Sequence, residues 1–242
     1  MTGTQSIRGA ARDAPWGFPA RERLGVLMLD TRFVRLPGDI GHPATFDFPV
    51  CRGVVDGATP RRVVHERDPA LLRPFIAVAQ ALIEAQGATA ITTSCGFLVL
   101  WQRELEAALP VPVWTSSLLL LPGLAHAGVV TVDASALTVR HLMAAGGDPA
   151  TPVEGLAPGC ALQRTLLEDL PQLDAADAER QVVAAAERLL GRAPELTDIV
   201  LECTNMAPHA QAVRRATGRR VHDITTLIAQ RFGSAAAMRG QA

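Results

Sequence analysis

An internal duplication is the feature that most constrains the fold of this chain. Residues 91–95 and 199–203 each form a short apolar segment that ends in a cysteine, Cys95 or Cys203. Another apolar segment follows each cysteine at the same distance of eighteen residues, at Val113 and at Val221. A repeat of about 105 residues is much longer than a solenoid unit. The duplication therefore predicts two similar lobes that face each other.

The segments around these repeats indicate an α/β fold with mostly parallel sheets. Continuous apolar runs at 24–29, 88–93, 129–132 and 198–201 predict buried strands. Helical periodicity is found at 68–87, 97–109, 116–124, 135–145, 161–170, 175–190 and 225–232. Alternation of strands and helices predicts parallel sheets that are covered on both faces.

The domain organisation follows from the repeat. We predict lobe one from residues 24–115 together with 223–242, and lobe two from residues 116–222. Residues 1–23 are rich in Arg, Ala and Pro without an apolar run, which predicts a poorly ordered N-terminal extension. Residues 32–43 contain Gly and Pro without periodicity and predict a long loop at the carboxyl end of the first strand. Loops in that position often carry functional residues.

The composition excludes several kinds of cofactor chemistry. All 23 basic residues are arginine, so the chain has no lysine for a pyridoxal phosphate Schiff base or for a Walker-type phosphate loop. No spacing of histidine and cysteine is typical of a metal site, and no Gly-x-Gly-x-x-Gly motif follows a strand. We therefore expect side-chain chemistry with no cofactor and no metal.

The charge balance favours small molecules as partners. The formal net charge is −1, so the sequence has no basic footprint for nucleic acid or for an anionic membrane. The longest apolar stretch, near 117–124, is too short to span a bilayer. Four cysteines in a chain of 242 residues, with no secretory segment, predict a reduced, cytoplasmic protein.

The two duplicated cysteines are the candidates for catalysis. Each is expected at the carboxyl end of a strand and at the start of a helix, where open α/β sheets bind ligands. A helix N-terminus lowers the pKa of a thiol, so Cys95 and Cys203 could each act as a base. Facing lobes would put them on opposite sides of one substrate carbon, where one removes a proton and the other returns it. Cys51 and Cys160 have no partner in the repeat and are predicted to be structural.

Polar groups near the cysteines are candidates for holding a substrate carboxylate. Hydroxyls and backbone N–H groups at helix starts suit an anion. Arg32 and Arg35 lie in the long loop and could bind a carboxylate through the guanidinium fork, with solvated loop charge as an equal alternative. Asp30 precedes this loop and is a functional candidate, whereas its counterpart Asp133 is more typical of a helix cap. The candidate donors are Thr93, Ser94, the Gly96 amide, Thr115, Ser116, Ser117, Thr204 and Asn205.

At these residues the chain resembles the cofactor-independent Asp/Glu racemase superfamily, which includes glutamate, aspartate and hydantoin racemases, maleate isomerase and arylmalonate decarboxylase. The segment Leu-Glu-Cys-Thr-Asn at 201–205 is similar to the Gly-Cys-Thr segment of glutamate and aspartate racemases. Thr-Thr-Ser-Cys-Gly at 92–96 stands where the first catalytic cysteine is expected. The resemblance spans residues 24–232.

This resemblance implies two pseudo-symmetric Rossmann-like lobes with the active site in the cleft between them. The two cysteines of the family are the opposing acid and base, which assigns these roles to Cys95 and Cys203. An aspartate after the first strand assists the first cysteine, here Asp30, and residues beside the cysteines hold the carboxylate, here Ser94 and Thr204. Homodimer formation is implied by the resemblance alone.

The chain also departs from the family pattern. Asn205 stands where glutamate racemases have a histidine after their Cys-Thr pair, which leaves the group that acidifies Cys203 unassigned. Thr-Arg-Phe-Val-Arg at 31–35 replaces a Ser-Gly loop, so Thr31 and Arg32 are counted among the substrate-binding candidates. Arylmalonate decarboxylases keep only the second cysteine, and the presence of both favours proton transfer or isomerisation over decarboxylation.

We predict an isomerase, specifically a racemase or epimerase of an amino acid or related small carboxylate that works by two-cysteine 1,1-proton transfer. The alternatives are a cysteine-dependent cis-trans isomerase or decarboxylase of a dicarboxylate, a non-catalytic carboxylate-binding protein, and a redox dithiol. The predicted site contains Cys95, Cys203 and Asp30 as catalytic residues, and Thr31, Arg32, Ser94, Gly96, Ser117, Thr204 and Asn205 as substrate-binding residues.

Overall fold

Two four-stranded sheets carry the duplicated halves of the chain. The computed structural model describes residues 22–239, so the predicted extension at 1–23 lies outside the described residues except for its last two positions. The first sheet contains β1 (Leu24–Leu29), β2 (Val50–Val55), β3 (Ala90–Thr93) and β4 (Val113–Trp114). The second contains β5 (Ala127–Thr131), β6 (Val153–Gly155), β7 (Asp198–Leu201) and β8 (Arg220–His222).

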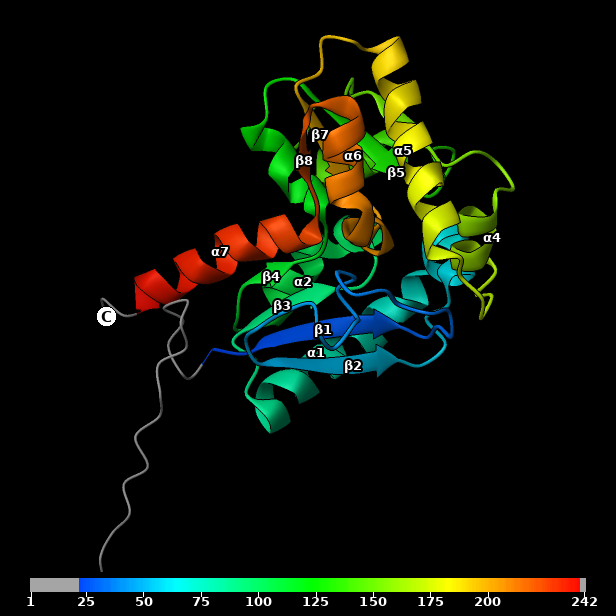
Figure 1. Ribbon diagram of the computed structural model, residues 1–242. Helices are drawn as coiled ribbons and strands as arrows, with labels where there is room; N and C mark the ends of the chain where they lie inside the picture. The colour runs from blue at the N-terminus through cyan, green and yellow to red at the C-terminus, as the bar shows by residue number, and fades with distance from the viewer. Residues whose placement is uncertain (1–21, 240–242) are drawn as a thin grey trace, which may run out of the picture.

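The two sheets have the same topology. Their strand orders are β2-β1-β3-β4 and β6-β5-β7-β8, and every pairing among the described strands is parallel (Figure 1). The register also repeats, since Gly25 pairs with Ile91 in the first sheet and Gly128 with Ile199 in the second. The α/β fold class with two similar lobes is therefore confirmed.

Equivalent glycines allow close packing at the same point of each lobe. A Cβ atom added to Gly25 would lie 2.6 Å from Cδ1 of Ile91, and one added to Gly128 would lie 2.6 Å from Cδ1 of Leu196. These contacts are too short for carbon atoms, so the repeated Gly-Val sequence has a steric cause. Strands β1, β3 and β7 are buried along their whole length, as expected of parallel strands covered on both faces.

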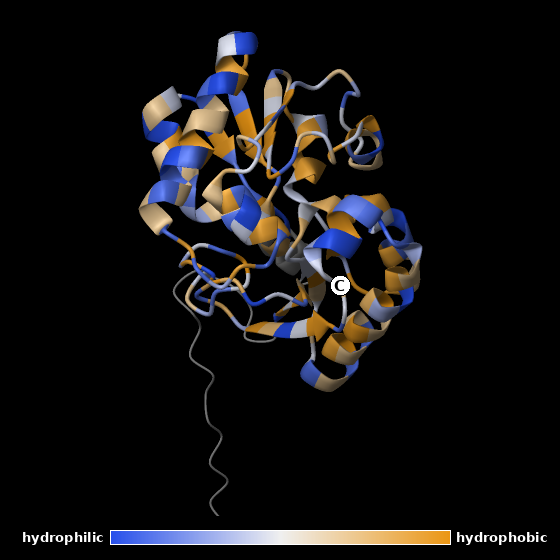
Figure 2. Ribbon diagram, turned by 90° about the vertical axis from the view of Figure 1, so that its right-hand side faces the viewer, coloured by the Kyte–Doolittle hydropathy of each residue, from blue (hydrophilic) through white to orange (hydrophobic). Residues whose placement is uncertain are grey.

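Seven α-helices cover the sheets within the described residues. They are α1 (Leu72–Gln86), α2 (Gln102–Ala108), α3 (Val139–Ala144), α4 (Ala161–Leu167), α5 (Ala175–Arg192), α6 (Ala210–Thr217) and α7 (Ile224–Arg239). Hydrophobic and hydrophilic residues alternate along them (Figure 2). None of the helices in residues 22–239 is long and apolar enough to cross a membrane.

Several predicted helices begin with or consist of tighter turns. The 3₁₀ helices are η2 (Pro69–Leu71), η3 (Gly96–Trp101), η4 (Ser117–Gly123) and η5 (Thr204–His209), and η1 (Arg61–Glu66) is a π-helix. Pro122 lies inside η4 and Pro208 inside η5. Because proline has no N–H to donate, these two segments cannot form regular α-helices. The helix expected at 116–124 is therefore the 3₁₀ helix η4, whereas the helix expected at 97–109 is divided between η3 and α2.

The turn that leads into α1 and the end of α1 follow from local sequence. The side chain of Asp68 caps η2 by accepting a hydrogen bond of 2.9 Å from the Ala70 amide, and Pro69 is at the start of that turn. Gly87 ends the helix with φ of 69°, a left-handed conformation that glycine adopts without a steric penalty. Phe75, Ala79 and Leu82 form the buried stripe of this helix.

Some elements were not foreseen or begin elsewhere. The outer strands β2 and β6 were not predicted, because their residues are only partly buried and lack a continuous apolar run. The helix expected at 135–145 begins at Val139. Asp133 caps the turn before it, with Oδ1 accepting a hydrogen bond of 2.9 Å from the Ser135 amide.

The last helix, α7, returns to the first sheet (Figure 1). Its residues Ile224, Leu227 and Ile228 belong to one buried cluster with Leu24 of β1 and Trp114 of β4. The assignment of residues 223–242 to lobe one stays a prediction. The boundaries at 115/116 and 222/223 stay predictions.

Candidate active site

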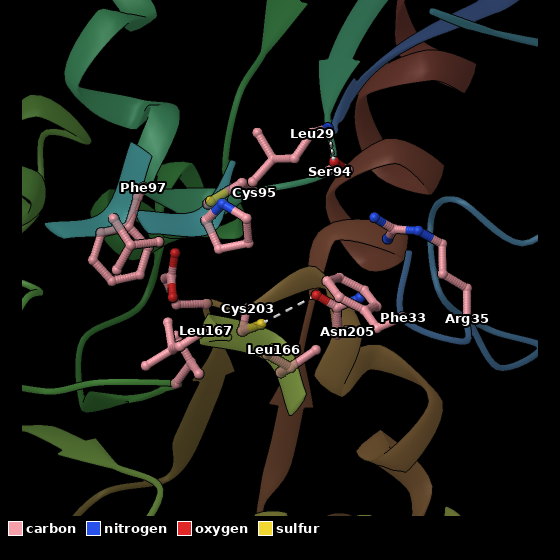
Figure 3. A pocket seen from close by; sticks show the side chains of 15 residues that line it. Leu29, Phe33, Arg35, Ser94, Cys95, Phe97, Leu166, Leu167, Cys203 and Asn205 are labelled. Atoms are coloured by element: carbon pink, nitrogen blue, oxygen red, sulfur yellow. Dashed lines mark hydrogen bonds between the residues drawn. The ribbon is translucent and has the colours of Figure 1, made fainter. Parts of the chain in front are cut away.

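The carboxyl ends of the two sheets meet at a single pocket that both duplicated cysteines line. Cys95 follows β3 and Cys203 follows β7, each two residues beyond the last residue of its strand. Five of the predicted site residues line this pocket, namely Ser94, Cys95, Gly96, Cys203 and Asn205 (Figure 3). The lobes therefore bring together residues that are more than a hundred positions apart.

The walls of the pocket are mainly apolar. They include Leu29 of β1, Phe33 in the loop after β1, Phe97 of η3, and Leu166 and Leu167 of α4. The cavity offers about 30 Å³ to the centres of water-sized spheres, which is the space that about two water molecules need. The pocket is thus narrow.

Backbone contacts hold Cys95 in place. Its thiol is largely buried, with 9% of the residue exposed. The hydroxyl of Thr93 donates a hydrogen bond of 2.7 Å to the Thr115 carbonyl, which ties the end of β3 to the segment after β4. The Leu29 amide donates a bond of 2.9 Å to Oγ of Ser94. These contacts fix the turn on which the cysteine sits.

A polar network from the opposite lobe surrounds Cys203. Its Sγ lies 3.6 Å from Oδ1 of Asn205, and Nδ2 of Asn205 donates to Oδ2 of Asp39 at 2.5 Å. Nη1 of Arg35 donates a bond of 2.9 Å to the other oxygen of Asp39. Asp39 is 1% exposed, so the ion pair is shielded from solvent. Asn205 thus connects the second cysteine to the loop after β1.

The thiols are less acidic than predicted. Burial raises the pKa of Cys95 to about 12, and the Glu202 carboxylate adds to the increase. Burial also raises the pKa of Cys203 well above its usual value, again with a contribution from Glu202. The prediction that a helix start lowers these pKa values is wrong. The turns that follow are six-residue 3₁₀ helices, and the desolvation of a buried thiolate outweighs their short dipoles.

Glu202 is a central member of the site that sequence reasoning missed. It is fully buried, and its Oε2 accepts a hydrogen bond of 2.7 Å from the Thr131 hydroxyl. No group in the described structure donates to its Oε1, which is also buried. Burial raises the pKa of Glu202 to about 7, opposed by the hydrogen bond from Thr131. The available signal was the carboxylate itself, which stands directly before Cys203 where glutamate racemases have glycine.

Three predicted residues from the segment after β1 do not line the pocket. The exposed Asp30 accepts a hydrogen bond of 3.1 Å from the Gly57 amide through Oδ2. Thr31 accepts one of 3.0 Å from Nη2 of Arg35. The side chain of Arg32 is 80% exposed and pairs with Asp169. Nothing in this arrangement brings these three side chains to the cysteines.

Two further predicted residues make structural hydrogen bonds instead, and the bond of Thr204 joins the two lobes. Oγ of Ser117 donates a hydrogen bond of 2.7 Å to the Leu201 carbonyl, and Oγ1 of Thr204 donates one of 2.7 Å to the Ser94 carbonyl. Both hydroxyls are buried. Because their protons are used in these bonds, Ser117 and Thr204 position the strand ends and do not line the pocket.

Arg35 takes the place that Arg32 was expected to fill. It lines the pocket, and its guanidinium carbon lies 4.8 Å from the centre of the Phe33 ring. Its side chain is only 13% exposed. The pattern of two arginines in one loop was visible in the sequence, but only the fold determines which one faces inward. Within residues 22–239, no group of three or more His, Cys, Asp or Glu side chains could hold a metal ion.

The chain is similar in sequence to a group of named lyases, whereas no family model matches it. The dimethylsulfoniopropionate lyase of Durusdinium sp. clade D is 30% identical over 217 residues, which cover 83% of this chain and 70% of that protein. The chain belongs to the dimethylsulfoniopropionate lyase family. Family members 6 and 7 of Emiliania huxleyi (strain CCMP1516) are each 29% identical over 226 residues, or 84% of this chain. Those alignments span only 57% and 64% of the two proteins.

Solved structures confirm the predicted fold. Unliganded arylmalonate decarboxylase has a TM-score of 0.56 at 17% identity, covering 83% of this chain and 86% of the other. Allantoin racemase from Klebsiella pneumoniae has a TM-score of 0.57 at 18% identity, with coverages of 90% and 88%. Glutamate racemase from Thermus thermophilus has a TM-score of 0.55 at 19% identity, with coverages of 91% and 82%. This member of the lyase family therefore has the fold of the Asp/Glu racemase superfamily.

Proposed function

We propose that this protein is a cysteine-dependent lyase that eliminates dimethyl sulfide from dimethylsulfoniopropionate. The observation that carries the proposal is that Cys95 and Cys203, one from each lobe, line the same largely apolar pocket as the Arg35 guanidinium. The relatives are named dimethylsulfoniopropionate lyases, and this name indicates the substrate and dimethyl sulfide as its leaving group. They favour elimination over the racemisation that the sequence alone predicts.

The reaction balances with a single base. Dimethylsulfoniopropionate has a carboxylate, a Cα with acidic hydrogens and a sulfonium group on Cβ. A thiolate removes one Cα proton and leaves an electron pair on that carbon. The pair becomes the carbon–carbon double bond while the Cβ–S bond breaks, and the electrons of that bond leave on sulfur. The products are acrylate and neutral dimethyl sulfide, and the proton stays on the cysteine.

Arg35 is suited to hold the substrate carboxylate. Its Nη1 and Nη2 donate to Asp39 and Thr31, which fixes the orientation of the guanidinium. An arginine has five N–H donors, so donors remain for a ligand. Loss of the Cα proton spreads negative charge onto the carboxylate oxygens, where a preorganised cation stabilises the transition state more than the ground state.

Ionisation of the thiol is coupled to substrate binding in this mechanism. Burial raises the pKa of Cys95 to about 12 and that of Cys203 well above its usual value, so both are neutral in the free site at pH 7. A substrate that brings a positive charge beside a buried thiol favours the thiolate, and the thiol proton is released to solvent on binding. The base therefore forms in the complex that requires it.

The direct test measures dimethyl sulfide in the headspace and acrylate in solution. We expect the wild-type protein to form both in equal amounts, and replacement of the basic thiol by Cys95→Ser or Cys203→Ser to slow the reaction by about 100-fold or more. Cys160→Ser is the matched control, because Cys160 does not line the pocket. If the wild-type protein forms no dimethyl sulfide, or both pocket variants react at the wild-type rate, the proposal is wrong.

Racemisation by 1,1-proton transfer is the second candidate. It is favoured by the presence of one thiol from each lobe in a single pocket, since elimination requires one base and racemisation requires two. The test follows loss of the Cα–H signal of amino acids and related carboxylates in deuterium oxide by NMR. Release of carbon dioxide from malonates, measured in parallel, tests the decarboxylase alternative. Racemisation predicts that Cys95→Ser and Cys203→Ser each abolish inversion.

A further inference from the structure

The carboxylate of Glu202 is buried in the pocket, and the proposed reaction gives it no role. We propose that Glu202 binds the cationic pole of the substrate, so that the site selects carboxylates with a sulfonium or quaternary ammonium group on Cβ. The choice of substrate rests on the proposed function, but the binding chemistry is tested without turnover.

The burial of Glu202 is the first argument. The residue is 0% exposed and lines the pocket beside both cysteines. Transferring a carboxylate from water into an apolar site costs free energy unless charge or hydrogen bonds compensate it. Thr131 satisfies only Oε2, and Oε1 has no partner in the described structure. An unsatisfied buried carboxylate oxygen in a pocket is a site for a cation or a donor.

The residue next to Oε1 is a glycine, Gly96. A Cβ atom on Gly96 would collide with Oε1 of Glu202, so glycine at this position makes space for the carboxylate. The hydroxyl of Thr131 holds the other oxygen and thereby fixes the plane of the group. The local sequence thus accommodates the carboxylate at some cost, which indicates a role beyond packing.

The pocket has two poles that match a zwitterion. Arg35 and Phe97 lie at opposite ends of it, with Cys95 and Cys203 between them (Figure 3). Glu202 belongs to the Phe97 end, because its Oε1 lies against the α-carbon of Gly96, the residue before Phe97. A substrate with its carboxylate on Arg35 would direct its onium group to Glu202 and the aromatic ring. Its Cα would then lie between the poles, near the thiols.

This arrangement makes binding dependent on pH. The charged and titratable groups that line the pocket with Glu202 are Cys95, Cys203 and Arg35, and Asp39 pairs with Arg35. Burial raises the pKa of Glu202 to about 7, so a cation that binds near pH 7 favours the ionised carboxylate and displaces a proton. Affinity for an onium ligand should rise as the pH increases through 7, and affinity for a neutral ligand should not.

Two unreactive ligands separate the effect of the positive charge on binding from the effect of shape. 3-(Trimethylammonio)propionate and 4,4-dimethylpentanoate have the same shape, and they differ only in having a cationic nitrogen or a neutral carbon. We expect wild-type protein to bind the cationic ligand about 10-fold or more tightly, as measured by calorimetry, and Glu202→Gln to reduce that preference to about 3-fold or less. Glu202→Asp, which withdraws the carboxylate by one methylene, should give an intermediate preference.

A measurement on protein with an intact Glu202 guards against Glu202 variants that do not fold. Calorimetry at pH 7 in two buffers of different ionisation enthalpy, on Cys95→Ser/Cys203→Ser protein in which no pocket thiol can ionise, should show proton release with the cationic ligand and none with its neutral isostere. Equal proton release with both ligands, or a cationic preference that persists in folded Glu202→Gln, would overturn the inference. If the wild-type protein forms dimethyl sulfide while the preference survives in Glu202→Gln, the inference fails and the lyase proposal stands. If the wild-type protein forms no dimethyl sulfide while Glu202→Gln loses the cationic preference, the cation subsite stands and the lyase proposal fails.

Discussion

Asn205 and Asp39, which are 166 positions apart in the sequence, are joined by a hydrogen bond from Nδ2 to Oδ2. The bond links the turn after β7 in lobe two to the loop after β1 in lobe one. Because Oδ1 of the same Asn205 lies 3.6 Å from Sγ of Cys203, the orientation of the amide at the second cysteine depends on Asp39. This relationship supplies the partner of Cys203 that the sequence did not reveal.

Asp39→Asn should therefore impair catalysis more than binding. The substitution replaces the charged acceptor of both Asn205 and Arg35, and loss of such bonds costs about 1.5–3 kcal/mol, or about 10- to 100-fold in kcat. Steady-state kinetics should show a smaller change in KM and an altered pH profile. Asp47→Asn, an exposed position in the same loop, is the control. An Asp39→Asn protein with wild-type kcat contradicts the positioning role.

The two arginines of the loop can be separated by a matched pair of variants. Arg35→Ala should raise the KM of a carboxylate substrate by about 10-fold or more, because its guanidinium lines the pocket in a shielded position. Arg32→Ala should change KM by less than about 3-fold, since an ion pair with an 80% exposed side chain contributes little. The opposite order in kinetic measurements would restore the sequence-based assignment to Arg32.

Gly96→Ala should destabilise the protein and lower its activity. The added methyl group would collide with Oε1 and the carbonyl oxygen of Glu202, and overpacking of this kind costs about 1–3 kcal/mol. Urea denaturation measures the loss. Gly191→Ala is the control, because a Cβ atom there meets nothing within 4 Å and alanine favours the helix by up to about 1 kcal/mol. Equal stability of the two variants would indicate that the pocket can expand around Glu202.

The raised pKa of Glu202 makes stability depend on pH with a definite sign. The folded protein binds the proton more tightly than the unfolded chain, so the stabilisation is complete below about pH 4.5 and is lost as the pH rises to about 7. A shift from 4.5 to about 7, at about 1.4 kcal/mol per unit, corresponds to about 3 kcal/mol.

The measurement is the difference in unfolding free energy between wild type and Glu202→Gln across this range. The difference should fall by an amount of that order between pH 4.5 and 7. Burial lowers the pKa of His141 to about 4, which gives wild type and variant an opposite slope that cancels in the difference. A difference that is constant with pH would show that Glu202 titrates as in the unfolded chain.

Much of the fold was accessible from the sequence because its signals are local. The apolar run of β1, the cap of Asp68 and the C-terminal Gly87 each determine a neighbouring element through backbone and short-range contacts. The duplication also located both cysteines at equivalent strand ends. The edge strands β2 and β6 escaped notice, since partly buried strands have no strong periodic signal. His209 is 3% exposed, because α5 and η5 pack together.

The sequence by itself determined the paired lobes, the two cysteines and the absence of lysine chemistry, since repeats and residue types are properties of the chain. Only the tertiary structure decided that Arg35 and not Arg32 faces the pocket, that Asp39 reaches Asn205, and that Glu202 is buried with one free oxygen. The tertiary structure also decided the pKa values of the two thiols. Burial and charges from distant segments set a pKa, and those arise when the lobes close on each other.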